Sequence, residues 1–144
     1  MADLILIPVL LFGVILGLYE LILIHRDESF RGSHWLGHGL HAIFFMIIAL
    51  FATMNTEFFL EVTGLLGSGI PLISNVLLVR IAVGIILNIK MHATSAVIKG
   101  GGLGARGMAE HWTHTIIVSA LVVIAPYIWP FVAPLVPSYL GGLA

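Results

Sequence analysis

Four long apolar runs constrain the fold of this chain more than any other feature of its sequence. A helix needs about 20 mostly apolar residues to cross a hydrocarbon core of about 30 Å. Runs of about that length cover residues 4–24, 35–54, 72–89 and 112–129. None of them alternates apolar and polar residues, so helices rather than barrel strands would satisfy the backbone hydrogen bonds in lipid. The sequence therefore predicts an all-α integral membrane protein with four transmembrane helices in a bundle.

The composition excludes several other classes of protein. Hydrophobic residues make up 60% of the chain and charged residues 9%, whereas soluble domains carry about 25% charged residues. Six Lys and Arg face seven Asp and Glu, so there is no basic surplus to neutralise the phosphates of a nucleic acid. Cysteine is absent, which removes disulfides, thiolate metal sites and cysteine nucleophiles.

The positions of Lys and Arg predict how the chain crosses the cell membrane, because basic residues in short loops stay cytoplasmic. Arg26 and Arg31 lie between the first two runs, and Lys90, Lys99 and Arg106 lie between the last two. The opposite side carries no basic residue. Both termini are therefore predicted on the non-cytoplasmic side. The first run is too long for a cleaved signal peptide and no basic segment precedes it, so we expect it to remain as a span.

Two further segments complete the single membrane domain expected over residues 1–144. The segment 57–66 spaces two carboxylates four residues apart, which predicts either a short helix in the plane of the membrane interface, the alternative we favour, or an extension of the second run. The segment 130–144 is apolar and contains three prolines, which cannot all sit inside a regular helix. We expect it to form a tail that packs on the protein or on a partner.

Histidines gather beside the two loops predicted to be cytoplasmic. The seven are His25, His34, His38, His41, His92, His111 and His114. Residues three and four apart share a helix face, so three of them form a stripe at the start of the second run and two pair on the fourth. Glu20 and Glu110 lie at a similar depth. Imidazole and carboxylate together suit transition metals, and bundles build such sites from facing helices.

This pattern predicts a site for a transition metal (iron, zinc or copper) or for haem b, with redox or metal-dependent chemistry at the membrane surface. The predicted metal ligands are His34, His38, His41, His92, His111, His114 and Glu20. Glu110 and Asn88 would orient ligands through hydrogen bonds. Haem b takes one axial histidine from each of two facing helices, and His38 or His41 with His114 meets that need. No catalytic residue is predicted.

Two other functions compete with this prediction. The chain can be a non-catalytic subunit of a larger membrane complex, in which the histidines form a hydrogen-bonded network. It can also be a homo-oligomeric channel or proton pathway that uses Arg80, midway along the third run, with Asn75 and Asn88. An arginine inside a membrane is costly and is a functional candidate by default. Its structural alternative is an ion pair with Glu57 or Glu61.

Gly13 and Gly17 form a GxxxG motif in the first run. Small residues at this spacing let a second helix approach closely. The motif predicts helix packing, either within the chain or in self-association of two copies.

The histidine spacings HxxxH and HxxH resemble parts of the histidine boxes of membrane di-iron desaturases and hydroxylases. The similarity covers about twenty residues around His34–His41 and His111–His114. This chain lacks the HxxHH boxes of that family and is far shorter. The resemblance therefore carries no activity to this chain.

Overall fold

The computed structural model describes residues 2–26, 35–98 and 112–140, and all regular elements in these ranges are helical. The long helices are α1 (Ile7–Arg26), α2 (Trp35–Met54), α5 (Val76–Ile98) and α6 (Trp112–Val132). The short elements are α3 (Thr56–Val62), η2 (Leu65–Gly67), α4 (Pro71–Ser74), η3 (Ala133–Leu135) and η4 (Ser138–Leu140). The prediction of an all-helical chain is confirmed for the described residues.

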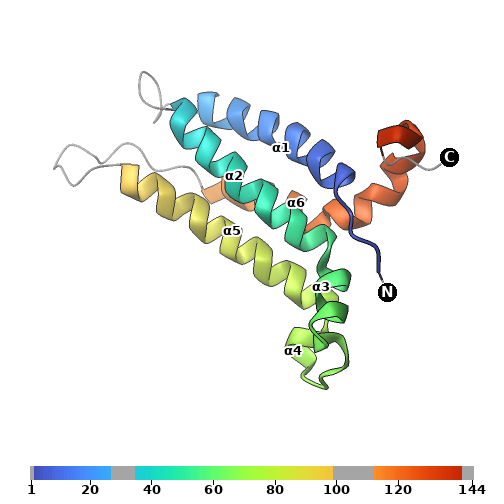
Figure 1. Cartoon of the computed structure of the whole chain (residues 1–144). Helices are drawn as coiled ribbons and strands as arrows, with labels where there is room; N and C mark the ends of the chain where they lie inside the picture. Colours follow the sequence, from blue (N-terminus) through green and yellow to red (C-terminus); the bar gives the residue numbers. More distant parts are fainter. Residues whose placement is uncertain (1, 27–34, 99–111, 141–144) are drawn as a thin grey trace.

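Helix α2 lies at the centre of the molecule and contacts α1, α5 and α6 (Figure 1). Helices α1 and α5 run in one direction, and α2 and α6 return in the other. The start of α1 and the end of α6 consequently lie at the same end of the molecule (Figure 1). The ends of α1 and α5 and the starts of α2 and α6 meet at the opposite end, which brings segments far apart in the sequence together.

In the part of the chain that the structure describes, two helices are long and apolar enough to cross a membrane. They are α1, with a mean hydropathy of 2.5, and Trp112–Leu135, with a mean hydropathy of 2.3. A third span results if the last part of α2, from Gly39, and α3 are counted as one helix bent by 64°. Within the described residues, α5 is not among the candidates. The predicted number of four spans is therefore supported for two or three helices.

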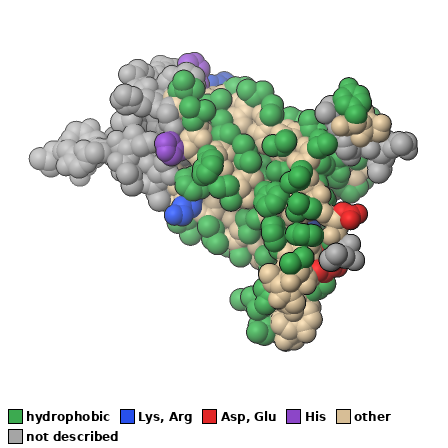
Figure 2. Space-filling view, in the orientation of Figure 1, with side chains coloured by type: hydrophobic (Ala, Val, Ile, Leu, Met, Phe, Trp, Pro, Cys, Tyr) green, Lys and Arg blue, Asp and Glu red, His purple; other side chains and the backbone are tan. Residues whose placement is uncertain are grey.

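The outward faces of all four long helices are apolar. Large side chains at about half exposure or more include Leu18 on α1, Phe44 on α2, Ile86 on α5 and Ile116 on α6. In the view of Figure 2 hydrophobic side chains cover most of the coloured surface; histidines and basic residues lie toward one end and acidic residues toward the other. In a soluble domain most of the exposed side chains would instead be polar or charged.

The interior combines an apolar core with several polar side chains. Met46 and Leu50 of α2 and Val118 and Val122 of α6 have no exposed surface and form its centre. The buried polar residues are Glu20, Thr53, Asn55, Thr56, Arg80, Thr115 and Ser119. Thr53, Asn55, Thr56 and Arg80 lie toward one end of the core, and Glu20 and Thr115 lie toward the other.

The break between α2 and α3 falls at Asn55. The side chain of Asn55 accepts a hydrogen bond from the backbone N–H of Ile5 and donates to the carbonyls of Ile5 and Phe51. These bonds attach the segment before α1 to the bend. Where a helix over 57–66 was expected, the structure has the shorter helix α3, which ends at Val62, and the chain then turns through Gly64 with a positive φ of 71°. Glycine adopts this backbone conformation without the steric cost that a side chain brings.

The third long helix starts later than its apolar run. The run was expected over 72–89, but Asn75 has extended backbone angles and its Oδ1 accepts a hydrogen bond from the N–H of Leu78 at 3.2 Å. The helix α5 therefore begins at Val76, and it continues to Ile98. Helix α6 likewise continues through Pro126 and Pro130 to Val132, beyond the expected 129, so the proline-rich tail starts inside a helix.

Gly13 and Gly17 lie at the contact between α1 and α2. A Cβ atom at residue 13 would lie 3.1 Å from Ile47 Cγ1, and one at residue 17 would lie 3.4 Å from Ile43 Cγ1. The GxxxG motif thus packs against isoleucines of the same chain, which is the intramolecular alternative of the prediction.

Candidate functional site

Glu20 lies on the inward face of α1. The buried residues Gly13, Leu16, Gly17 and Ile24 precede and follow it at helical spacing. Its side chain is fully buried, at 0% exposure, and both carboxylate oxygens are enclosed. A carboxylate in an apolar interior is costly unless a charge, a proton or a metal compensates it. Glu20 is therefore a candidate for a functional role at the end of the bundle where the histidines lie.

His92 of α5 contacts α6 through Thr115. The Nε2 atom of His92 lies 2.9 Å from Thr115 Oγ1, and Asn88 Nδ2 donates to the same oxygen at 2.9 Å. The indole of Trp112 lies against the imidazole, with ring centroids 3.6 Å apart. These contacts fix the ring of His92. Because Thr115 contacts Nε2, a metal at that nitrogen would have to displace the threonine.

Thr115 is the residue at this end that the sequence analysis missed. It is fully buried and accepts the hydrogen bond of Asn88, which connects Asn88 to His92. Its position in the sequence was the signal that could have found it. Thr115 directly follows His114 and lies three residues before Val118, so it shares a helix face with that buried residue. The name "histidine end" is used below for Glu20, Asn88, His92, His114 and Thr115.

Thr115→Val is expected to lower the free energy of unfolding by about 1–3 kcal/mol, because it removes the fully buried hydroxyl that the half-buried side chains of Asn88 and His92 share as a hydrogen-bond partner. Valine has nearly the same shape, so the core packing is preserved. Trp112 fluorescence should change as well, since the ring of His92 loses its anchor. Denaturation in detergent measures the first effect. The matched control Thr113→Val changes an exposed residue, and an equal loss in both variants would contradict the assignment.

The other predicted ligands differ in how they are placed. His114 of α6 is half-buried and its Nδ1 atom is enclosed, whereas His41 of α2 and His25 of α1 are exposed. His34, Glu110 and His111 lie outside the described residues, and for His38 the description covers the backbone of α2 alone. The proposed haem pair of His41 with His114 thus combines an exposed and a half-buried side chain. Within the part of the chain that is described, no three His, Asp or Glu side chains are grouped as a metal site.

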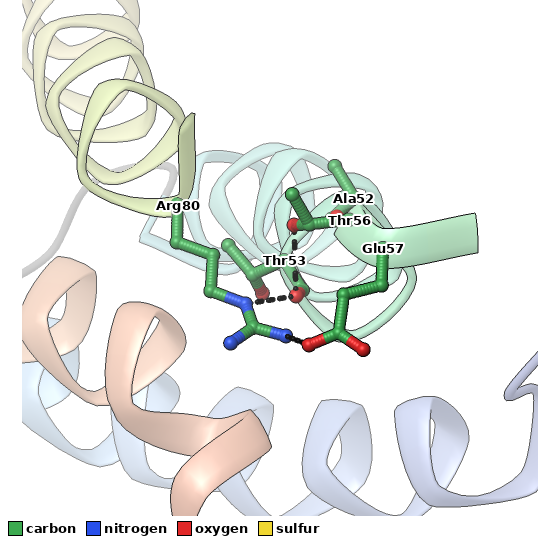
Figure 3. A network of polar contacts seen from close by, with 5 residues as sticks. All are labelled: Ala52, Thr53, Thr56, Glu57 and Arg80. Carbon is green, nitrogen blue, oxygen red and sulfur yellow. Dashed lines mark hydrogen bonds and ion pairs between the residues drawn. The ribbon is translucent and has the colours of Figure 1, made fainter. Parts of the chain in front are cut away.

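A second polar cluster surrounds Arg80 at the opposite end of the core. Its Nε donates to the carbonyl of Thr53 at 2.9 Å, and its Nη2 lies 3.7 Å from Glu57 Oε1 (Figure 3). The guanidinium carbon lies 4.9 Å above the ring of Tyr127. Thr56 Oγ1 also donates to the carbonyl of Thr53. The carbonyls in the last turn of a helix have no partner further along the helix, so Arg80 and Thr56 satisfy one of them at the end of α2.

The ion pair expected for Arg80 is therefore found with Glu57, while Glu61 accepts a hydrogen bond from the backbone N–H of Ala2. The threonines of this cluster were not predicted, although Thr53, Asn55 and Thr56 stand out as polar residues at the end of an apolar run. The residues proposed for a conducting path have different partners: Asn75 bonds to Leu78, Arg80 to Thr53 and Asn88 to Thr115.

The described structure defines a helical protein with two or three helices suited to cross a membrane and with two buried polar clusters. No protein-family model, no curated protein and no solved structure matches the chain. The function must therefore be argued from the residues themselves.

Proposed function

We propose that the chain is an integral membrane protein in which α1, α2, α5 and α6 form a four-helix bundle, with both termini on the non-cytoplasmic side of the cell membrane. The apolar outward faces of the four helices support this proposal, because lipid replaces water around such a surface. The start of α1 and the end of α6 lie at the same end, as an even number of spans requires.

Single cysteines test this topology directly, since the chain has none of its own. Ser68→Cys lies in the exposed turn after η2, and Ser29→Cys lies in the loop predicted to be cytoplasmic. A membrane-impermeant maleimide is expected to label Ser68→Cys on intact cells and Ser29→Cys after permeabilisation. Labelling of both positions on intact cells, or the reverse pattern, would rule out the proposed orientation.

We propose further that the histidine end holds a transition metal (iron, zinc or copper) or haem b. The observation that carries this proposal is the full burial of the Glu20 side chain on α1 at the end of the bundle where His92 and His114 lie. His92 and His114 bring imidazoles to the same end from α5 and α6, and α2 starts there with His38 in its first turn. Glu20, His92 and His114 would be ligands, with His34, His38, His41 and His111 available to complete the set.

Asn88 has the orienting role in this proposal. It reaches His92 through Thr115, and such outer hydrogen bonds fix the ring of a ligating histidine. Glu110, beside His111 in sequence, is proposed for a similar task. A bound metal or haem would supply redox or Lewis-acid chemistry close to the membrane surface.

Metal titration of the apoprotein in mild detergent tests the ligand set. His114→Ala is expected to weaken binding at least about tenfold, since even hydrogen-bond partners of ligands change metal affinity by 10–100-fold. The matched control His25→Ala removes an exposed imidazole at the end of α1 and should leave the affinity unchanged. Equal affinities of wild type and His114→Ala would exclude His114 as a ligand.

A second candidate function is that of a non-catalytic subunit in a larger membrane complex, in which the histidines form a hydrogen-bonded network. The segment after α6 favours it: Phe131, Leu135 and Tyr139 are 79%, 84% and 77% exposed, the largest values among the exposed large hydrophobic side chains. These three side chains, from α6, η3 and η4, offer exposed apolar surface to a partner. Photo-crosslinking from residue 135 in native membranes tests this, and adducts with lipid alone would count against a partner subunit.

A further inference from the structure

A cavity of about 360 Å³ lies at the end of the molecule opposite the histidine end. Its walls come from the segment before α1, the bend between α2 and α3, and the later part of α6. The polar residues that line it are Asp3, Asn55, Glu57 and Arg80, and Trp129 closes one side. The volume falls within the range of about 300–1,000 Å³ that is typical of small-molecule sites.

Arg80 presents donors to this cavity from a fixed position. Its side chain is 8% exposed, and the hydrogen bond from Nε to the carbonyl of Thr53 holds the guanidinium in place (Figure 3). The contact from Nη2 to Glu57 is 3.7 Å, which is too long for a hydrogen bond. Among the described residues no hydrogen bond reaches Nη1 or Nη2. A planar guanidinium with free donors matches the geometry of an oxyanion such as phosphate.

The other charges of the cavity indicate what accompanies that oxyanion. Asp3 and Glu57 are both exposed at its edge, so the cavity holds one positive and two negative side chains. A purely anionic ligand would be repelled by the two carboxylates. A ligand that carries an ammonium group next to its phosphate would satisfy Arg80 and the carboxylates together.

An apolar hollow of about 410 Å³ adjoins the polar cavity. It is lined by Leu4, Leu6, Ile7 and Pro8, and it shares Ile5 and Trp129 with the polar cavity. A polar pocket that continues into an apolar groove suits an amphipathic molecule rather than a free ion. Tryptophan is also enriched at the level of lipid headgroups.

We propose that this cavity binds the headgroup of an aminophospholipid of the phosphatidylethanolamine type. The phosphate lies against the Nη atoms of Arg80, the ammonium lies between Asp3 and Glu57, and an acyl chain follows the apolar hollow beside Trp129. This site is separate from the histidine end and does not depend on a metal there.

Native mass spectrometry of the detergent-solubilised protein tests the site, with an equimolar mixture of phosphatidylethanolamine, phosphatidylcholine and phosphatidylglycerol of matched chains. The phosphatidylethanolamine adduct is expected to be the most abundant. Arg80→Gln should reduce the affinity for this lipid at least about tenfold, because it removes one charge-assisted hydrogen bond. Arg26→Gln, at the far end of α1, should leave it unchanged. No preference among the three lipids would overturn the proposal.

A second variant keeps the test valid if Arg80→Gln does not fold. Asp3→Asn with Glu57→Gln changes two exposed side chains, and it should shift the preference toward the anionic phosphatidylglycerol. An unchanged preference in this double variant would overturn the charge assignment. Soluble phosphoethanolamine at the same concentration is expected not to displace the lipid, and displacement at equal concentration would assign the site to a soluble phosphate ester instead.

Discussion

Glu20→Gln is expected to remove the bound metal almost completely while leaving the apoprotein folded. The amide keeps the shape of the side chain but cannot supply an anionic ligand from the buried face of α1. Loss of a ligand should exceed the 10–100-fold effect of losing a hydrogen-bond partner of a ligand. The metal content of the purified variant is therefore expected below about a tenth of the wild-type value.

The stability of the apoprotein separates this role from a structural one. Metal binding contributes to the free energy of folding, so Glu20→Gln should lower the stability of the metal-loaded protein and change that of the metal-free protein much less. Glu57→Gln is the control, because its side chain is 59% exposed at the opposite end of the core. An unchanged metal content in Glu20→Gln, or an equal loss in Glu57→Gln, would refute the assignment of Glu20.

Gly84→Val is expected to have the largest effect on stability, a loss of about 3 kcal/mol in the free energy of unfolding. A Cβ atom at residue 84 would lie 2.4 Å from Val123 Cγ2 and 3.5 Å from the carbonyl oxygen of Ser119. Valine has one preferred rotamer in a helix, so Val123 cannot turn away easily. Helices α5 and α6 would have to separate, and such overpacking typically costs about 1–3 kcal/mol or more.

A graded series checks this expectation by denaturation in detergent. Gly84→Ala should cost less than Gly84→Val, because alanine favours the helix over glycine by about 1 kcal/mol and offsets part of the clash. Gly67→Ala adds a methyl group where no atom lies within 4 Å and should change stability by less than about 0.5 kcal/mol. Equal stability of Gly84→Val and the wild type would mean that α5 and α6 do not touch here.

Hydropathy predicted where the long helices lie. The run over 35–54 has the same bounds as α2, and the run from 112 starts where α6 starts. The largest difference is in α5, because hydropathy follows the apolar residues and not the backbone. The extended backbone of Asn75 delays the start of α5 to Val76. Lys90 ends the apolar run, but α5 continues beyond it to Ile98.

The sequence predicted which types of residue gather at the site, but it did not predict how their side chains are oriented. The stripe of histidines on α2 could not be oriented from the sequence, since the helix is apolar on every side. The structure turns Ala42 and Met46 inward, and the neighbouring His41 consequently lies at the surface. The key hydrogen bonds of the two clusters, Arg80 to Thr53 and Asn88 to Thr115, each join residues 27 apart on different helices. Helical periodicity does not contain such contacts.

The most direct test of the proposed metal site is an optical spectrum, recorded together with elemental analysis, of the protein purified in mild detergent without a histidine tag. We expect near-stoichiometric iron, zinc or copper, with a Soret band if the group is haem b. A folded protein that is colourless and free of metal would contradict the account.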